Sequence, residues 1–431
     1  MRPLLLLIAL AIVVHAADKG GPEPWAVTPS ANAGRTGAYK ASTRYAGCDY
    51  QVCVPSTYSV DNPAGVHLFF HGQNGQQWSH DFGRWKKHLL EPFNLIGINM
   101  HYEDGDNAKD TETKVMAAQQ AVAQICADYK VIVPRGVVSS FSGGGLPHGL
   151  TAEKYASVRG ARWPFTLSAL YGSNYWKDAS LGVPMAWYIA VGSDEWNMGK
   201  PSLGQSALAR AGELYRAGAR SGGPDLFVQV TAGKGHTIED RDAELAAKLF
   251  ALSDLAFTPC IYVPDYTDKE LKELRPVVEL ANAVKTGAAS AALAKLLAKP
   301  GLAEPVQAAA TRLHARLATR LDAVAAMVAR LAEEDAVRAA YYGPLLLAQL
   351  KGAAQEKDAR AALAAAAKTG GKVLAAHAEF AKLVPEAFGP GGAGPTPLPT
   401  AVERLTLLAP VLGERSQSGQ VAAAIIALGK K

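Results

Sequence analysis

The sequence is poor in features that mark several large functional classes. Charged residues make up only 19% of the 431 residues, and 44 basic residues nearly balance 39 acidic ones, for a net charge of +5. No arginine-rich or aromatic–basic cluster occurs, so nothing favours nucleic-acid binding. The four cysteines lack the spacing of a zinc site.

A long hydrophobic run is missing as well. The apolar run Leu4–Val14 has 11 residues, whereas a membrane-spanning helix needs about 20. Arg2 precedes this run and Ala16 follows it, which is typical of a signal peptide over residues 1–16. We therefore predict a secreted or periplasmic protein without stable membrane insertion, and an uncleaved membrane anchor is the less favoured alternative.

An exported protein can form disulfides, and four cysteines allow three pairings. Cys48 and Cys53 lie in a strand-like run. If the run is extended, they sit about 16 Å apart, which is too far for a disulfide bond. They can pair with each other only if the chain turns between them, and the pairing with Cys126 and Cys260 stays open.

Residues 17–257 have the pattern of an α/β domain. Short apolar runs alternate with amphipathic stretches, which predicts a mostly parallel sheet covered by helices on both faces. The predicted strands are Tyr50–Val54, Val66–His71, Leu95–Met100, Val137–Phe141, Phe165–Tyr171, Met185–Val191 and Leu226–Val230. The predicted helices lie near Trp78–Leu90, Thr113–Asp128, Thr151–Arg159, Gln205–Ala217 and Arg241–Leu255.

The rest of the chain predicts an all-α region. Residues 268–388 are rich in alanine and form a helical domain, residues 389–399 a Gly/Pro linker, and residues 400–431 a last helical segment. Arg312, Arg316 and Arg320 fall on one helical stripe. We expect a solvated face there more than a docking face for an acidic partner. We also expect the α/β domain to keep its chemistry when residues 268–431 are deleted.

The most informative motif surrounds Ser142. An apolar, β-branched strand ends at this serine, and Gly143, Gly144 and Gly145 follow at once. Such a strand–turn–helix elbow exposes the hydroxyl of a nucleophilic serine. Ser140 stands where the usual motif has glycine, and Pro147 is expected to interrupt the helix that follows, with a restart near Thr151.

Another strand ends in His71-Gly72 and a polar glycine turn. In an acyl-transfer enzyme this position aims a backbone N–H at the developing oxyanion. We expect the two donors to be the amides of Gln73 and Gly143.

Two further strands end in candidate partners for the serine. Met185–Val191 runs into Asp194, our predicted triad acid, with the adjacent Glu195 as the competitor. Leu226–Val230 runs into a glycine loop that carries His236, the predicted base. The chain order Ser142, Asp194, His236 is that of the α/β-hydrolase triad, and all three follow predicted parallel strands.

These sequence segments resemble those of the α/β-hydrolase superfamily, and in particular those of secreted esterases of the polyhydroxybutyrate depolymerase and feruloyl esterase type. The resemblance covers residues ~48–257. It implies a serine esterase that forms an acyl-enzyme and needs no metal or organic cofactor. The helical region lies outside the resemblance and is a candidate for protein contacts.

The predicted substrate is a small or polymeric ester. Tyr175, Trp176 and Trp196 lie in loops that should border the site and could bind an acyl group or a polymer chain, although packing within those loops is an equal alternative. A serine peptidase or an acyltransferase would use the same triad. A noncatalytic binding protein of the cell envelope on the same scaffold is the alternative from a different class.

Overall fold

The computed structural model describes residues 27–75, 77, 82–102, 108–157, 164–173, 186–192, 195, 226–231, 233–387, 397–414 and 416–430. The predicted signal peptide lies outside this part of the chain. Among the described residues, no helix combines the length and apolar character needed to cross a membrane.

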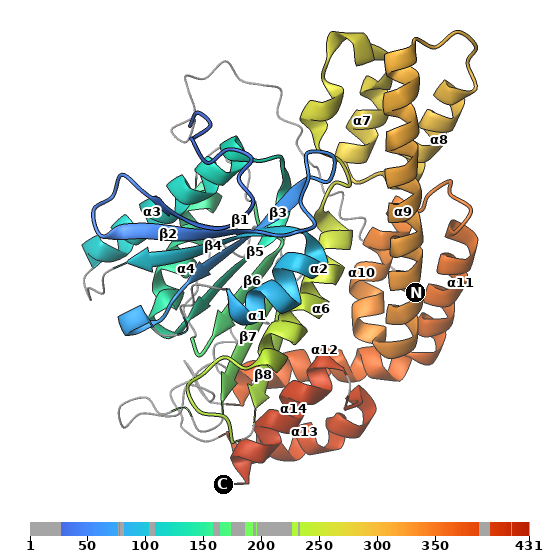
Figure 1. Cartoon of the computed structure of the whole chain (residues 1–431). Helices are drawn as coiled ribbons and strands as arrows, with labels where there is room; N and C mark the ends of the chain where they lie inside the picture. Colours follow the sequence, from blue (N-terminus) through green and yellow to red (C-terminus); the bar gives the residue numbers. More distant parts are fainter. Residues whose placement is uncertain are drawn as a thin grey trace.

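The centre of the molecule is an eight-stranded sheet in the order β1-β2-β4-β3-β5-β6-β7-β8 (Figure 1). β2 is antiparallel to its neighbours β1 and β4, and all pairs from β4 to β8 are parallel. This confirms the predicted α/β class with a mostly parallel sheet and a helical region after it. The strands are β1 (Gly37–Ser42), β2 (Cys48–Val54), β3 (Ala64–Phe70), β4 (Leu95–Tyr102), β5 (Val131–Phe141), β6 (Leu167–Tyr171), β7 (Ala186–Gly192) and β8 (Leu226–Thr231).

Seven of these strands coincide with the predicted ones, and β1 was missed. β1 is an edge strand that buries only Tyr39, so it lacks the apolar run by which the others were recognised. The Tyr39 hydroxyl meets the Tyr129 hydroxyl at 2.9 Å and fixes this edge to the end of α3 (Ala108–Asp128).

Helices cover both faces of the sheet. On one face, α1 (Gly83–Trp85), the π-helical turn Lys86–Leu90, α2 (Glu91–Phe93) and α6 (Asp240–Phe257) close a core around Phe69, Tyr171 and Phe250. α3 and α4 (Gly145–Ser157) lie on the other face. The predicted interruption at Pro147 was wrong, because Pro147 sits in the first turn of α4, where no intrahelical partner exists for its missing N–H.

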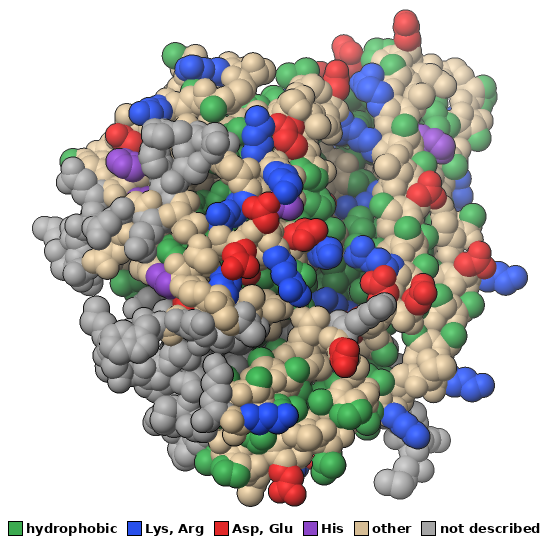
Figure 2. Space-filling model, turned by 60° about the horizontal axis from the view of Figure 1, so that its bottom comes forward, with side chains coloured by type: hydrophobic (Ala, Val, Ile, Leu, Met, Phe, Trp, Pro, Cys, Tyr) green, Lys and Arg blue, Asp and Glu red, His purple; other side chains and the backbone are tan. Residues whose placement is uncertain are grey.

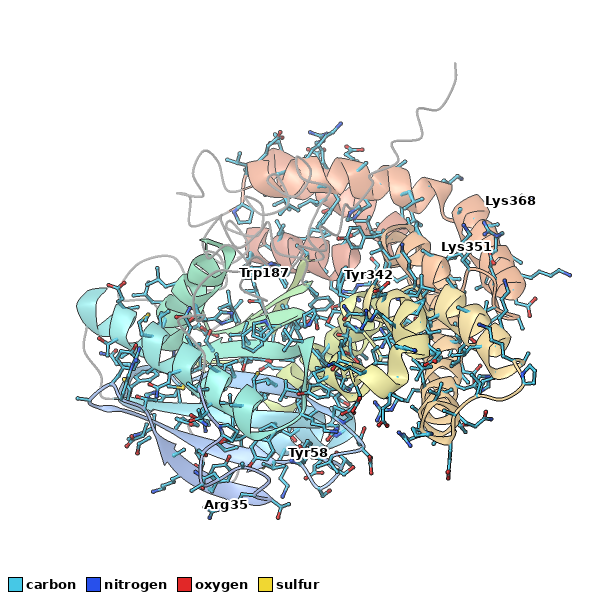
Figure 3. All side chains as sticks on the ribbon, turned by 90° about the horizontal axis from the view of Figure 1, so that it is seen from above. Arg35, Tyr58, Trp187, Tyr342, Lys351 and Lys368 are labelled. Atoms are coloured by element: carbon cyan, nitrogen blue, oxygen red, sulfur yellow. The ribbon has the colours of Figure 1, made fainter. Side chains whose placement is uncertain are left out.

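The helical region begins as a bundle beside the sheet. It contains α7 (Arg275–Asn282), α8 (Thr286–Leu297), α9 (Glu304–Glu334), α10 (Ala336–Gln349) and α11 (Glu356–Thr369). The apolar stripe predicted around Leu313 and Val324 is buried in α9. Lys351 and Lys368 lie on the outer side of this bundle, while Tyr342 lies inside it (Figure 3).

The last three helices pack on the sheet itself. α12 (Gly371–Glu386), α13 (Pro399–Leu412) and α14 (Gln417–Gly429) lie beside β7 and β8 (Figure 1). Phe380, Leu405 and Ile425 share one continuous core with Trp187 of β7 and Val228 of β8, and each of these side chains is at most 1% exposed. The C-terminal helices therefore complete the cover of the sheet where it carries β7 and β8.

The expected solvated arginine stripe was wrong at its third member. Arg320 is buried, and its guanidinium donates to the carbonyls of Asp254, Leu255 and Thr258, the carboxyl end of α6. The Arg316 side chain donates to the Asp61 carbonyl. The stripe joins α9 to the α/β domain.

The four cysteines are free thiols, so the expected disulfide is not found. Cys48 and Cys53 lie in the continuous strand β2 and belong to the cores on opposite faces of the sheet. The chain does not turn between them, which excludes their pairing with each other.

Candidate active site

Ser142 occupies a strained backbone position directly after β5. Its φ of 49° lies in the left-handed region, which a non-glycine residue adopts only when the surroundings enforce it. Gly144 explains how the turn fits, since a Cβ at that position would lie 2.4 Å from the carbonyl oxygen of His71. Ser142 is therefore presented on a sharp elbow that presses against the end of β3.

Ser140, which replaces the usual glycine, has a defined partner. Its hydroxyl lies 2.9 Å from Nδ1 of His148, and Nε2 of that ring lies 2.8 Å from the hydroxyl of Ser168. His148 is fully buried, and desolvation lowers its pKa to about 3, so the imidazole is neutral. The ring joins α4 to β5 and β6 directly below the elbow, which is a packing role.

The predicted oxyanion segments approach each other. A Cβ on Gly143 would lie 3.7 Å from the backbone nitrogen of Gln73, so the turn after β3 borders the turn after β5. His71 fixes the first turn: its Nδ1 lies 2.6 Å from the Gly72 oxygen, and its carbonyl accepts from the Tyr102 hydroxyl at 2.6 Å. The Tyr102 ring also stacks on the imidazole at 4.0 Å.

The structure pairs His236 with Glu195. Nδ1 of His236 lies 3.0 Å from Oε2 of Glu195, and Oε1 accepts the Gly192 N–H at 2.7 Å. Glu195 is 1% exposed, so both carboxylate oxygens are held in a buried turn after β7. Asp194, the predicted acid, lies outside the described residues, and its competitor is the residue in contact with the histidine.

His236 follows β8 but reaches back toward the serine strand. β8 is three strands from β5 in the sheet. The imidazole nevertheless lies 4.6 Å from the Phe141 ring, and a Cβ on Gly172 would lie 2.9 Å from its Cε1. The loop thus carries the base over the end of β6 to the residue that precedes Ser142.

This arrangement fixes the tautomer needed for base catalysis. A carboxylate accepts from the Nδ1–H, which leaves the lone pair on Nε2. The ring is 32% exposed while the carboxylate beneath it is fully covered. A buried acceptor on one side and a free nitrogen on the accessible side are what a general base requires.

Tyr175, Trp176 and Trp196 lie outside the described residues. Within the described part of the chain, no group of three His, Cys, Asp or Glu side chains is arranged to hold a metal ion.

The sequence did not predict how Glu195 is held after β7. The backbone N–H of Glu195 donates to the Gly192 carbonyl, with N and O 3.4 Å apart, so Glu195 is held against the residue that ends β7. No signal in the sequence separated Glu195 from the adjacent Asp194.

Comparisons with known proteins describe about half of the chain. No protein-family model matches the sequence, and no curated protein does. Among solved structures, the chain is similar to Est1E from Butyrivibrio proteoclasticus (TM-score 0.38, 10% identity, 51% of this chain and 99% of that one). It is also similar to LpqC, the poly(3-hydroxybutyrate) depolymerase from Bordetella parapertussis (0.34, 17%, 51% and 87%).

A third solved structure, of a thermostable esterase, is similar with a TM-score of 0.33 and 14% identity. The match covers 45% of this chain and 54% of that esterase, so it spans about half of each.

Proposed function

We propose that the protein is a serine hydrolase that cleaves carboxylic esters, with Ser142 as nucleophile, His236 as base and Glu195 as acid. The observation that carries the proposal is the hydrogen bond between His236 Nδ1 and the buried Glu195 carboxylate. A loop histidine has no structural need of a covered carboxylate, whereas a catalytic imidazole must be oriented and its cation stabilised.

The reaction proceeds by two acyl transfers. Ser142 Oγ attacks the ester carbonyl as its proton passes to His236 Nε2, and the Gln73 and Gly143 amides bind the oxyanion. The alcohol leaves with the proton from His236, and an acyl-enzyme remains. Water then attacks the acyl carbon, gives its proton to His236, and the acid departs as Ser142 recovers its proton.

Hydrolysis of short-chain p-nitrophenyl esters tests the proposal. We expect the wild type to be active and Ser142→Ala to lose at least about 10³-fold in kcat, because only the oxyanion site and substrate binding remain. Equal rates for the two proteins would refute the assignment, and a wild type inactive on every ester would favour a noncatalytic binding role.

The finer proposal is an exported esterase acting on polyester or plant-polysaccharide esters. It is supported by the signal-like N-terminus and by the resemblance of residues ~48–257 to such enzymes. Rates on a panel of hydroxycinnamate esters, acetylated sugars and polyhydroxybutyrate decide the substrate. Peptide substrates and acyl-acceptor alcohols belong in the same panel, since a peptidase or acyltransferase uses the same triad.

A further inference from the structure

A buried ion pair lies two residues from the proposed base. Nζ of Lys234 is 2.5 Å from Oδ2 of Asp242, in the first turn of α6. The two side chains are 1% and 2% exposed. Lys234 and His236 belong to the same short loop between β8 and α6, so the pair fastens the loop that carries the imidazole.

Asp242 holds the far end of this loop as well. Its Oδ2 also accepts the backbone N–H of Glu239 at 2.8 Å, which closes the capping box at the start of α6. The loop from Lys234 to Glu239 is thus tied at both ends to one carboxylate. The Ile238 carbonyl between them accepts from Arg84, and the Thr237 hydroxyl from Gln77 at 3.3 Å.

The backbone of Lys234 also lies against the end of β7, close to Glu195. A Cβ on Gly192 would lie 1.9 Å from the Lys234 carbonyl oxygen, so the base loop lies directly on the residue that donates to Glu195. Any displacement of Lys234 moves His236 relative to its acid partner.

Two buried phenols, of Tyr171 and Tyr188, lie within electrostatic reach of Asp242. Burial, and after it the charge of Asp242, raises the pKa of the Tyr171 and Tyr188 phenols well above the usual range, so both stay neutral. Arg84 acts on Tyr171 and Arg241 on Tyr188 with the opposite sign. Lys234 is the cation in hydrogen-bond contact with Asp242.

Buried ion pairs are poor sources of stability, because desolvation offsets the Coulomb attraction and apolar replacements are often tolerated. They are directional, however, and fix one arrangement of the segments that bear them. We propose that Lys234 and Asp242 are positioning residues, which hold the base loop so that His236 lies between Glu195 and Ser142. This inference rests on the proposed function.

The test removes both charges at once, since Lys234→Met alone would leave a buried, unpaired carboxylate. In the double variant Lys234→Met/Asp242→Asn, the amide oxygen still accepts the Glu239 N–H. We expect a folded protein whose kcat on p-nitrophenyl acetate falls about 10²-fold with KM within about twofold, because a misplaced base slows the chemical step. A loss confined to kcat separates misplacement of the base from a general loosening of the fold, which would also change KM and Tm.

Lys87→Met is the matched control. Lys87 pairs with Asp240 in the same turn of α6 at 2.9 Å, but both side chains are exposed, and kcat should stay at the wild-type value. A folded double variant with wild-type kcat would overturn the inference.

The single variant Asp242→Asn provides an independent test, because a buried lysine can release its proton and stay neutral. The same loss of kcat is expected, and wild-type turnover in this variant would also count against the inference. An inactive wild type would defeat the proposed function, whereas an active wild type with an active double variant would defeat only the positioning role.

Discussion

Glu195 is bound through both carboxylate oxygens, one to a backbone N–H and one to the imidazole. An amide in its place would still fill the turn, but its NH2 group would face a hydrogen-bond donor on one side. In the proposed triad, Glu195 therefore acts through its charge and its effect on the imidazole tautomer more than through its shape.

Glu195→Gln should lower kcat about 10³–10⁴-fold with little change in Tm, by analogy of role with other triads in which the acid becomes an amide. Asp194→Asn is the matched comparison, and its kcat should stay within a few-fold of the wild type. Steady-state rates on p-nitrophenyl acetate distinguish the two residues. A large loss in Asp194→Asn together with an active Glu195→Gln would return the role to Asp194.

Gly172 sets the position of the imidazole from the other side. Its φ is +56°, and a Cβ there would lie 2.9–3.0 Å from two ring atoms of His236. Gly172→Ala should lower kcat by about 10²-fold, because the ring must move away from the serine.

Gly233→Ala is the control for Gly172→Ala, since φ is +71° but a Cβ would meet nothing within 4 Å. Both variants should lose about 1 kcal/mol of unfolding free energy from backbone strain, measured by urea denaturation. Equal kcat values would show that the contact with His236 does not matter.

β5, the strand that leads to the proposed nucleophile Ser142, is bordered by two buried histidines. Ser140 of β5 contacts His148, and Ser139 lies 2.7 Å from Nε2 of His67 on β3. Desolvation lowers the pKa of each imidazole to about 3, from 6.5 when exposed. Between about pH 6.5 and pH 3, both imidazoles are therefore neutral in the folded protein, whereas they become protonated in the unfolded chain.

These histidines predict acid destabilisation. As pH falls from about 6.5 toward about 3, the unfolded chain binds protons that the folded chain does not bind. The free energy of unfolding is therefore highest above this window and decreases within it. Within this window, each histidine lowers the free energy of unfolding by about 1.4 kcal/mol for every unit by which the pH falls.

His148→Gln should reduce the slope of unfolding free energy against pH by about that amount between pH 5.5 and 4. Urea titrations of both proteins across this range measure the difference. Parallel slopes would mean that His148 becomes protonated within the fold.

Much of the element scale was predictable. Seven strands and the apolar stripe of α9 were predicted from the spacing of apolar residues, because burial produces this spacing in strands and in helices alike. β1 and Arg320 were not predictable, since an edge strand buries little and an arginine that caps another helix has the same sequence pattern as a solvated one. The places of Ser142 and His236 after parallel strands could be predicted, but which of two adjacent acids contacts His236 depends on backbone contacts that form only in three dimensions.

At the scale of the whole molecule, the two regions are one unit. α12–α14 cover β7 and β8, the strands that lead to Glu195 and His236. Arg320 joins α9 to the end of α6, whose first turn holds the base loop. On the face seen in Figure 2, basic and acidic side chains intermingle over the described surface, without a large patch of one sign.

The sequence-based expectation that residues 268–431 are dispensable is therefore revised. Deletion of residues 371–431 should give insoluble or inactive protein, because it uncovers Trp187, Ile189 and Val228. Ile425→Asp should destabilise by more than about 3 kcal/mol, since it buries a charge without a partner.

Leu407→Asp, on a side chain that is 73% exposed, should have almost no effect on stability. Tm and esterase activity of the soluble fraction measure both substitutions. A soluble, active deletion variant would show that the sheet does not need this cover.

The thiols described above have a practical consequence for handling the protein. Burial raises the pKa of Cys126 to about 12 and raises that of Cys53 and Cys260, so little thiolate is available to react. Folding then needs no oxidant, and a reducing host suffices for production. Cys48 and Cys53 are each 4% exposed, so the rate at which a thiol-specific dye labels these two residues reports on opening of the sheet.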